Sequence, residues 1–250
     1  MTASEPGQAL FARYAYPPNE LGYCGPTDGS PLLQRASGDQ AMDIAAHARQ
    51  FEGAWTYLEL IASAVGIDDP LDRRVVQAYW VGNDLLDRVA PSVLVARLGQ
   101  ELEGQVGGFW SRMGPAAEEL ALPHHSFHVF AVYPWVGLLG SAGDVPLSVL
   151  DRCRIRWGEV VGIDGERATV RSRPLRWDGD ELSLGPEREE AVRWSSSGRS
   201  LVGGIVPGDH VSLHWDWVCD RLGAAELGAL ELTSARQLEL TNTQLREGAR

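Results

Sequence analysis

The sequence predicts an α+β protein. A mainly α-helical N-terminal domain is expected at residues 1–145, and a small antiparallel β-barrel with a C-terminal helix at residues 146–250. Apolar residues recur at helical spacings in the first part, whereas the second has short branched and aromatic runs between Gly-rich turns. A chain of 250 residues, 44% of them hydrophobic, is long enough to bury the core of one large or two modest domains.

The N-terminal helices are predicted from apolar spacing and from capping residues. Asp39 is a candidate N-cap, and Gly66 is suited to end the helix that follows it. Residues 11–32, which are rich in Tyr, Pro and Gly, are expected to be irregular. The apolar stripe of the first helix is Ile44, Ala48, Phe51, Trp55, Leu58 and Ile61. The predicted helices cover residues 39–66, 69–89, 91–103 and 115–122, while residues 124–139 fit either a kinked helix or a buried strand.

The C-terminal part is predicted to be a barrel because hairpin turn signals separate its short apolar runs. Asp164-Gly165 and Asp178-Gly179 are typical two-residue turns between antiparallel strands. The predicted strands cover residues 153–162, 167–176, 181–184, 189–195 and 209–215. Beyond Leu222 the spacing becomes helical again, with a packing face of Leu227, Leu230, Leu238 and Leu245.

Composition excludes several classes of function. The chain carries 34 acidic and 22 basic residues, a net charge of −12, which argues against binding to nucleic acid or to an anionic membrane surface. All the basic residues are Arg, so no Schiff-base or P-loop lysine exists. Three scattered cysteines fit a reducing compartment. The longest apolar run, residues 129–139, is too short to span a bilayer, and a cytoplasmic location is expected.

An ordered set of residues in the C-terminal part carries a family resemblance. Cys153 stands five residues before Gly158, and Gly208-Asp209 precedes a predicted strand that ends at His214, with a helix after it. In this order and spacing, residues 151–235 resemble the HypC/HupF family of [NiFe]-hydrogenase maturation chaperones. Cys153 departs from the family pattern because it is internal rather than N-terminal.

This resemblance implies an OB-like barrel and a role in metal-centre assembly. Cys153 and His214 would be metal ligands for an iron that carries cyanide and carbon monoxide, and Gly158, Gly208 and Asp209 would shape the site. The implied partner is a hydrogenase large-subunit precursor or another maturation protein. A thiolate and a neutral imidazole are suitable donors for such an iron, and two donors to one metal should lie within about 5 Å of each other.

The N-terminal part offers a second set of candidates. Residues 11–26 contain Cys24 among several aromatic residues, and His124, His125 and His128 follow Pro123. These two segments resemble an uncharacterised bacterial domain that is found with hydrogenase genes. On a helix, His124 and His128 would share one face.

These residues support an alternative function. The chain would be an enzyme in which Cys24 is a nucleophile or ligand and one of the three histidines is a base or co-ligand, making or handling a diatomic ligand. One shared site would require the Cys24 loop to fold back onto the segment after Pro123. A third alternative is a docking scaffold that carries out no chemistry.

Overall fold

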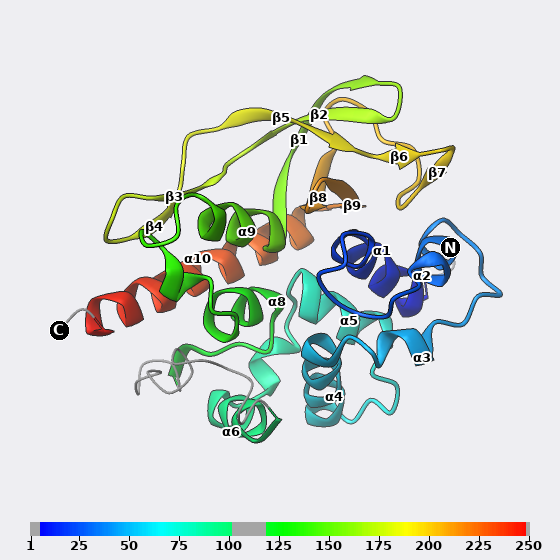
Figure 1. Cartoon of the computed structure of the whole chain (residues 1–250). Coiled ribbons are helices and arrows are strands. Elements are labelled where there is room, and N and C mark those ends of the chain that lie inside the picture. Colours follow the sequence, from blue (N-terminus) through cyan, green and yellow to red (C-terminus); the bar gives the residue numbers. More distant parts are fainter. Residues whose placement is uncertain (1–5, 102–118, 249–250) are drawn as a thin grey trace.

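The computed structural model describes residues 6–101 and 119–248 and shows a mixed α and β protein. Short helices make up one side of the molecule, five strands form a barrel on the other, and a long C-terminal helix runs beside both (Figure 1). The predicted α+β class, with a helical N-terminal part and a helical C-terminal end, is confirmed. The first half of the helix predicted at 115–122 lies outside the described residues, and of the other half only residues 119 and 120 are helical.

The sequence predicts an irregular segment at residues 11–32. This prediction is confirmed for residues 21–29 but wrong for residues 11–20 and 30–32, which are helical. Helix α1 continues through Pro17 and Pro18, each of which removes one backbone hydrogen bond to the residue four positions earlier. Burial of Phe11 and Tyr14 on this helix outweighs that local cost. The helices of the N-terminal part are α1 (Gly7–Glu20), α2 (Ser30–Ala36), α3 (Ala45–Ala48), α4 (Glu52–Val65), α5 (Arg73–Trp80) and α6 (Pro91–Glu101).

The helix predicted at 39–66 is in fact two helices, because the backbone leaves the helical region at Phe51 (φ −87°, ψ 69°) between α3 and α4. Gly66 ends α4 as expected, in the left-handed conformation (φ 68°) that glycine adopts without strain. The next helix starts later than predicted, since Asp72 rather than Asp69 caps α5 by accepting a hydrogen bond from the Arg74 amide.

Four short helical segments lead into the barrel: α8 (His125–Phe127), the π-helical turn η3 (His128–Val132), the 3₁₀ turn η4 (Val136–Leu138) and α9 (Val145–Cys153). Residues 124–139 are therefore helical rather than a strand. Cys153 ends helix α9 and does not begin a strand, so the strand predicted from 153 starts three residues later at Arg156.

The five barrel strands are β1 (Arg156–Asp164), β2 (Arg167–Ser172), β5 (Arg188–Arg193), β8 (His210–His214) and β9 (Trp217–Arg221). They are hydrogen-bonded in the order β1-β2-β5-β9-β8, and β8 pairs with β1, so the barrel is closed. Strand β9 was not predicted. It closes the barrel against β5 through one parallel pair, Arg193 and Trp217, whereas the other pairings are antiparallel.

Two small hairpins lie outside the barrel. Strands β3 (Leu175–Trp177) and β4 (Leu182–Leu184) pair with each other, as do β6 (Ser195–Ser196) and β7 (Arg199–Ser200). The strand predicted at 181–184 is therefore real but does not belong to the barrel.

Helix α10 (Ala224–Gly248) packs along both parts of the molecule. Its predicted packing face is confirmed: Leu230 is buried with Leu227 against the helical core, and Leu238 and Leu245 contact the cluster around Leu150. The largest apolar core joins residues from both sides of the boundary expected at 145/146. Its members from the C-terminal side are Ile155, Leu201, Trp217, Cys219, Leu222, Leu230 and Leu240. Among the described helices, none has the length and apolar character needed to cross a membrane.

Candidate metal centre

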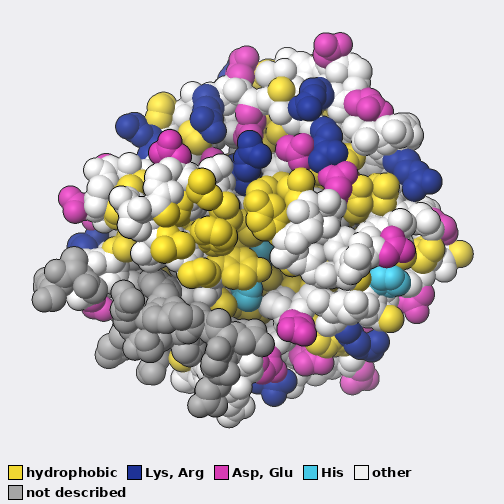
Figure 2. All heavy atoms as spheres, viewed as in Figure 1, with side chains coloured by type: hydrophobic (Ala, Val, Ile, Leu, Met, Phe, Trp, Pro, Cys, Tyr) yellow, Lys and Arg dark blue, Asp and Glu magenta, His cyan; other side chains and the backbone are white. Residues whose placement is uncertain are grey.

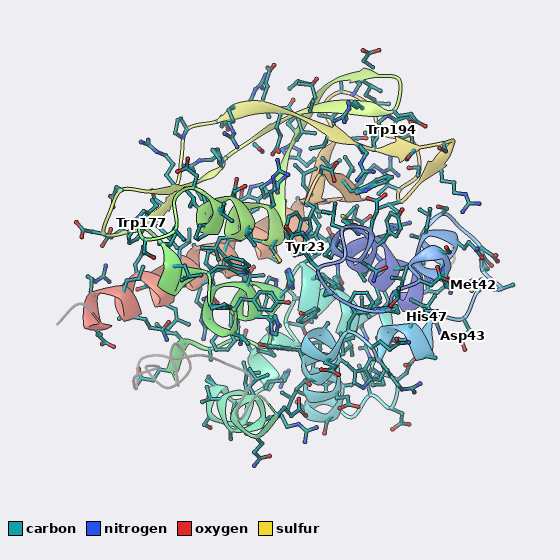
Figure 3. The ribbon with its side chains drawn as sticks, in the orientation of Figure 1. Tyr23, Met42, Asp43, His47, Trp177 and Trp194 are labelled. Atoms are coloured by element: carbon teal, nitrogen blue, oxygen red, sulfur yellow. The ribbon has the colours of Figure 1, made fainter. Side chains whose placement is uncertain are left out.

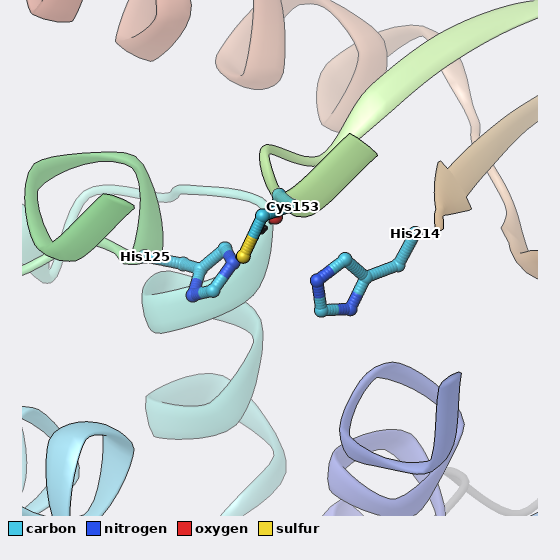
Figure 4. Close-up of side chains that lie close together, drawn as sticks. All are labelled: His125, Cys153 and His214. Carbon is cyan, nitrogen blue, oxygen red and sulfur yellow. Dashed lines mark hydrogen bonds between the residues drawn. The ribbon is translucent and has the colours of Figure 1, made fainter. Parts of the chain in front are cut away.

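Three side chains from distant parts of the sequence converge in the interior of the protein. His125 comes from α8, Cys153 from the end of α9 and His214 from the end of β8 (Figure 4). One donor atom of each residue lies within 4.8 Å of the donors of the other two, and all three residues are buried. Cys153 and His214 therefore meet the separation of about 5 Å expected for two ligands of one metal. Their role as ligands stays a prediction.

Arg156 connects the segment that carries Cys153 to the hairpin that carries His214. Its guanidinium donates hydrogen bonds to the carbonyl of Trp215 (2.7 Å) and to those of Asp151 (3.2 Å) and Arg152 (3.4 Å). It also forms an ion pair of 3.0 Å with Glu190 on β5. Because Arg156 is only 3% exposed, these bonds form in a low-dielectric interior and fix α9 against the β8–β9 turn.

The orientation of His214 is set by helix α1, which is distant from strand β8 in the sequence. His214 Nδ1 donates a hydrogen bond of 2.7 Å to the carbonyl oxygen of Tyr14 on α1. In an unbroken helix that carbonyl would bond the amide of residue 18, but Pro18 has no N–H. The proline thus leaves a carbonyl available for the imidazole. His214 Nε2 then carries the lone pair, and this atom is buried without a hydrogen-bond partner among the described residues.

His125 is oriented by two partners. Its Nε2 lies 2.8 Å from the Cys153 carbonyl, which can only accept, so in the neutral ring Nε2 holds the proton. Its Nδ1 lies 3.3 Å from the hydroxyl of Tyr79. The Tyr79 hydroxyl can then donate to Nδ1, which carries the lone pair. Nδ1 is therefore the ring atom that could coordinate a metal while Nε2 keeps its hydrogen bond to the Cys153 carbonyl.

The triad lies in the wall of a cavity of about 410 Å³. On the face shown in Figure 2, histidine atoms are visible in a hollow surrounded by hydrophobic side chains. We call this cavity the chamber. Its lining residues are Pro18, Tyr23, Cys24, Gly25, Gln50, Phe51, Glu52, Gly53, Ala54, Tyr79, Trp80, His125, His128, Tyr133, Pro134, Trp135, Val149, Cys153, His214 and Trp215.

Cys24 and His128 also line the chamber, so the two sets of candidate residues meet in one place. Asn19 donates hydrogen bonds to the carbonyls of Cys24 (2.8 Å) and Pro26 (2.7 Å), which folds the loop after α1 back over the chamber. His128 Nδ1 lies 3.4 Å from the Tyr57 hydroxyl. The fold-back expected for a shared Cys24 and histidine site is therefore present.

Four predicted site residues do not line the chamber. His124 faces a separate small cavity beside Arg154, and its Nδ1 accepts a hydrogen bond from the Ser126 amide at the start of α8. Gly158 lies on β1, where an added Cβ would come within 2.4 Å of the Arg171 carbonyl of the neighbouring strand. Gly208 has a φ of 95°, and Asp209 accepts a hydrogen bond from the Val206 amide in the same turn. In the structure these two glycines and the aspartate shape the barrel and its turn.

Burial keeps the imidazoles and thiols of the chamber uncharged. Desolvation lowers the pKa of His125 to about 4 and that of His128 to about 3, and it lowers the pKa of His214 as well. Desolvation also raises the pKa of Cys24 to about 12 and raises the pKa of Cys153. The imidazoles are thus ready to coordinate at neutral pH, whereas Cys153 must lose its proton as a metal binds.

These histidines should make the metal-free protein acid-sensitive. Their pKa in the unfolded chain is about 6.5, so below that pH the unfolded state binds more protons than the folded state. The contribution of these histidines to the free energy of unfolding is therefore full above about pH 6.5. It declines as the pH falls toward their pKa values in the folded protein. Between pH 7.5 and 5.5 we expect a loss of about 1.4 kcal/mol for each of His125 and His128, measured by urea unfolding. His128→Phe should reduce this loss, while replacement of the exposed His210 by Gln should not, and a flat profile would contradict the argument.

Sequence reasoning missed Tyr79, Tyr133 and Trp215 as chamber residues. Only Trp215 carried a signal, because it follows His214 directly in the sequence. Nothing local to Tyr79 or Tyr133 distinguishes them from aromatic core residues, since their place in the chamber depends on how α5 and η3 pack. His47 is on α3 and is not among the residues that line the chamber, and Figure 3 shows it apart from Tyr23, which is.

Comparisons with known proteins match this chain to one family. The model of a family of unknown function, DUF6390, matches residues 3–248. No curated protein and no solved structure matches the chain.

Proposed function

The chain belongs to the DUF6390 family, and from its geometry we propose that it holds one iron ion through His125, Cys153 and His214 as an assembly factor for the metal centre of a [NiFe] hydrogenase. The observation that carries the proposal is the convergence of one thiol and two imidazoles within 4.8 Å of one another. In this role the iron is cargo for another protein.

The unpartnered nitrogen of His214 supports a metal rather than a purely structural role. Buried polar atoms nearly always have hydrogen-bond partners, and leaving one unpaired costs about 1–3 kcal/mol. His214 is fully buried, and its Nδ1 proton is already used by the Tyr14 carbonyl. A bound metal at Nε2 would satisfy the remaining lone pair, which is why this atom supports coordination.

The donor set supports a soft or borderline transition metal. Thiolate and imidazole ligands suit iron and zinc, and they disfavour magnesium and calcium, which prefer oxygen ligands. Three protein donors leave at least one coordination position open. An open position is what a site needs if it is to receive an ion and pass it on.

The link to hydrogenase maturation rests on the resemblance to the HypC/HupF family. Cys153 and His214, the two residues that the resemblance marks as ligands, belong to the triad. Numbered in chain order, the five barrel strands follow one another around the ring as first, second, third, fifth and fourth, which suits an OB-like barrel. His125 adds a third donor that the resemblance does not supply, and it ties the helical part to the same task.

The mouth of the chamber supports delivery to a protein partner such as a large-subunit precursor. Tyr23 lines the chamber and is 55% exposed, and Leu21, two residues earlier, is 47% exposed. Contiguous exposed apolar residues of this kind are typical of surfaces that contact other proteins. A partner that covered them would lie directly over the exit from the metal site.

A second candidate function is supported by the two further reactive groups in the chamber. Cys24 and His128 line it together with the triad, which would allow an enzyme to act on a ligand held at the metal. This enzyme would make or handle the diatomic ligand that an assembly factor carries. If the protein is such an enzyme, the Cys24→Ser variant should lose turnover and keep its metal.

Metal analysis of protein purified without oxygen tests the proposal. We expect close to one iron per chain, with infrared bands in the cyanide and carbonyl stretching region. His214→Gln should lose most of the iron because it removes the unpartnered Nε2. His210→Gln is the matched control, since it changes an exposed histidine on the same strand and should keep the iron. Wild-type protein without metal, or His214→Gln with full iron content, would refute the proposal. Zinc in place of iron would refute the assignment of iron as the metal that the protein delivers.

A further inference from the structure

Three chamber-lining residues carry a buried polar atom without a hydrogen-bond partner among the described residues: Trp80, His214 and Trp215. The last two are consecutive in the sequence. Their unpartnered atoms are His214 Nε2, which carries a lone pair, and Trp215 Nε1, which carries a proton. Trp215 is only 4% exposed, so its indole is largely shielded from bulk solvent. The His214 nitrogen could bind a metal ion, and the Trp215 N–H could donate a hydrogen bond to a ligand on that ion, so the two atoms could hold opposite ends of one bound group.

Trp215 is held in a conformation that its residue type disfavours. Its φ of 54° lies in the left-handed region, which non-glycine residues rarely adopt because of steric strain. Three contacts maintain it: the Trp215 amide donates to the Arg152 carbonyl (2.8 Å), Arg156 donates to the Trp215 carbonyl (2.7 Å), and the indole stacks on Tyr23 with centroids 4.3 Å apart. Such strain persists where surrounding contacts impose it, and here it places the indole beside the triad.

The charge of the loaded triad indicates what the open position would accept. A divalent ion, one thiolate and two neutral imidazoles sum to a charge of +1 in an apolar cavity. No Arg is among the lining residues, and Glu52, the one carboxylate there, is exposed to solvent and therefore compensates a buried charge only weakly. An uncompensated buried charge is costly, so a monoanion on the metal would neutralise the site where a neutral molecule would not.

We propose that the chamber binds a small monoanion on the triad metal, and that the Trp215 indole N–H donates a hydrogen bond to that anion. This inference rests on the metal site of the proposed function but not on its link to hydrogenase. Trp215 is then a specificity-determining residue for the exogenous ligand. It selects anions that keep an accepting lone pair on an atom away from the metal.

Azide titration of the cobalt(II)-loaded protein tests this inference. Cobalt(II) reports thiolate and azide binding through its visible and near-ultraviolet bands. We expect azide to bind to wild-type protein and to bind about tenfold more weakly to Trp215→Phe, which keeps an aromatic ring against Tyr23 and removes the N–H. Trp135→Phe is the matched control, because it removes another indole from the same lining and should leave azide affinity unchanged.

The outcomes separate this inference from the proposed function. If cobalt(II) binds with a thiolate band that depends on Cys153, but azide either fails to bind or binds Trp215→Phe as tightly as wild type, this inference is wrong and the metal site stands. If no such cobalt(II) band appears, both are wrong. An equal loss of azide affinity in Trp135→Phe and Trp215→Phe would also overturn the specific role of Trp215.

Discussion

Cys153→Ser is expected to abolish iron binding while the protein still folds. The substitution replaces sulfur by oxygen at nearly constant volume, so the packing around this residue, which is 8% exposed, changes little. A serine hydroxyl does not ionise at neutral pH and is a poor donor for iron, so the site would retain two imidazoles and no anionic ligand. We expect iron content to fall at least tenfold, measured on protein purified without oxygen.

The same variant should fail to support hydrogenase maturation, measured as hydrogen uptake in a deletion strain complemented with each variant. Cys24→Ser is the matched control, since it changes a thiol of the same chamber that lies outside the triad, and it should retain most of the activity. Protein levels must be equal for the comparison to hold. Full activity with Cys153→Ser and none with Cys24→Ser would transfer the chemistry to the Cys24 loop and favour the enzyme alternative.

Arg156→Met is expected to be the most destabilising of the substitutions considered, at about 3–5 kcal/mol. It would leave Glu190 without its ion-pair partner and the Trp215 carbonyl without its donor, in a region that is largely buried. The loss follows from groups left unpaired rather than from the value of the ion pair itself. Urea unfolding measures it directly.

Arg171→Met provides the control for Arg156→Met. Arg171 is 41% exposed and pairs with Glu159 at 3.5 Å and Glu189 at 3.9 Å, so its removal should cost less than about 1 kcal/mol. Since Arg156 also fixes the end of α9 against the β8–β9 turn, Arg156→Met should weaken metal binding as well. Equal unfolding midpoints for the two variants would show that Arg156 does not organise the site.

Local rules predicted those elements whose ends and faces depend on neighbouring residues. Gly66 ends a helix because glycine adopts a positive φ without strain, and Pro91 begins one because the first turn needs no amide donor. The leucine spacing after Leu222 predicted the buried face of α10 for the same reason, since helical period alone fixes which residues share a face.

Where long-range packing competes with local preference, sequence reasoning was wrong. Pro17 and Pro18 favour an irregular segment, yet the segment is helical because Phe11 and Tyr14 are buried against the rest of the core. Strand β9 has no turn signal that separates it from β8, because the turn uses Trp215 at a positive φ where glycine or asparagine would be expected. Neither outcome follows from propensities.

The candidate site divides in the same way. The sequence by itself determined the chemistry of the potential donors, because a thiol or an imidazole has the same donor atoms wherever it lies. The family resemblance carried by its motif order singled out Cys153 and His214, whose donor atoms lie close together in the structure. Only the tertiary structure decided that His125 joins them, that His124 does not, and that Cys24 and His128 line the same chamber. Side chains from residues 28 and 89 positions apart bring their donor atoms within 4.8 Å because Arg156, the Tyr14 carbonyl and the closed barrel hold three chain segments together. Such contacts have no local signature in the sequence.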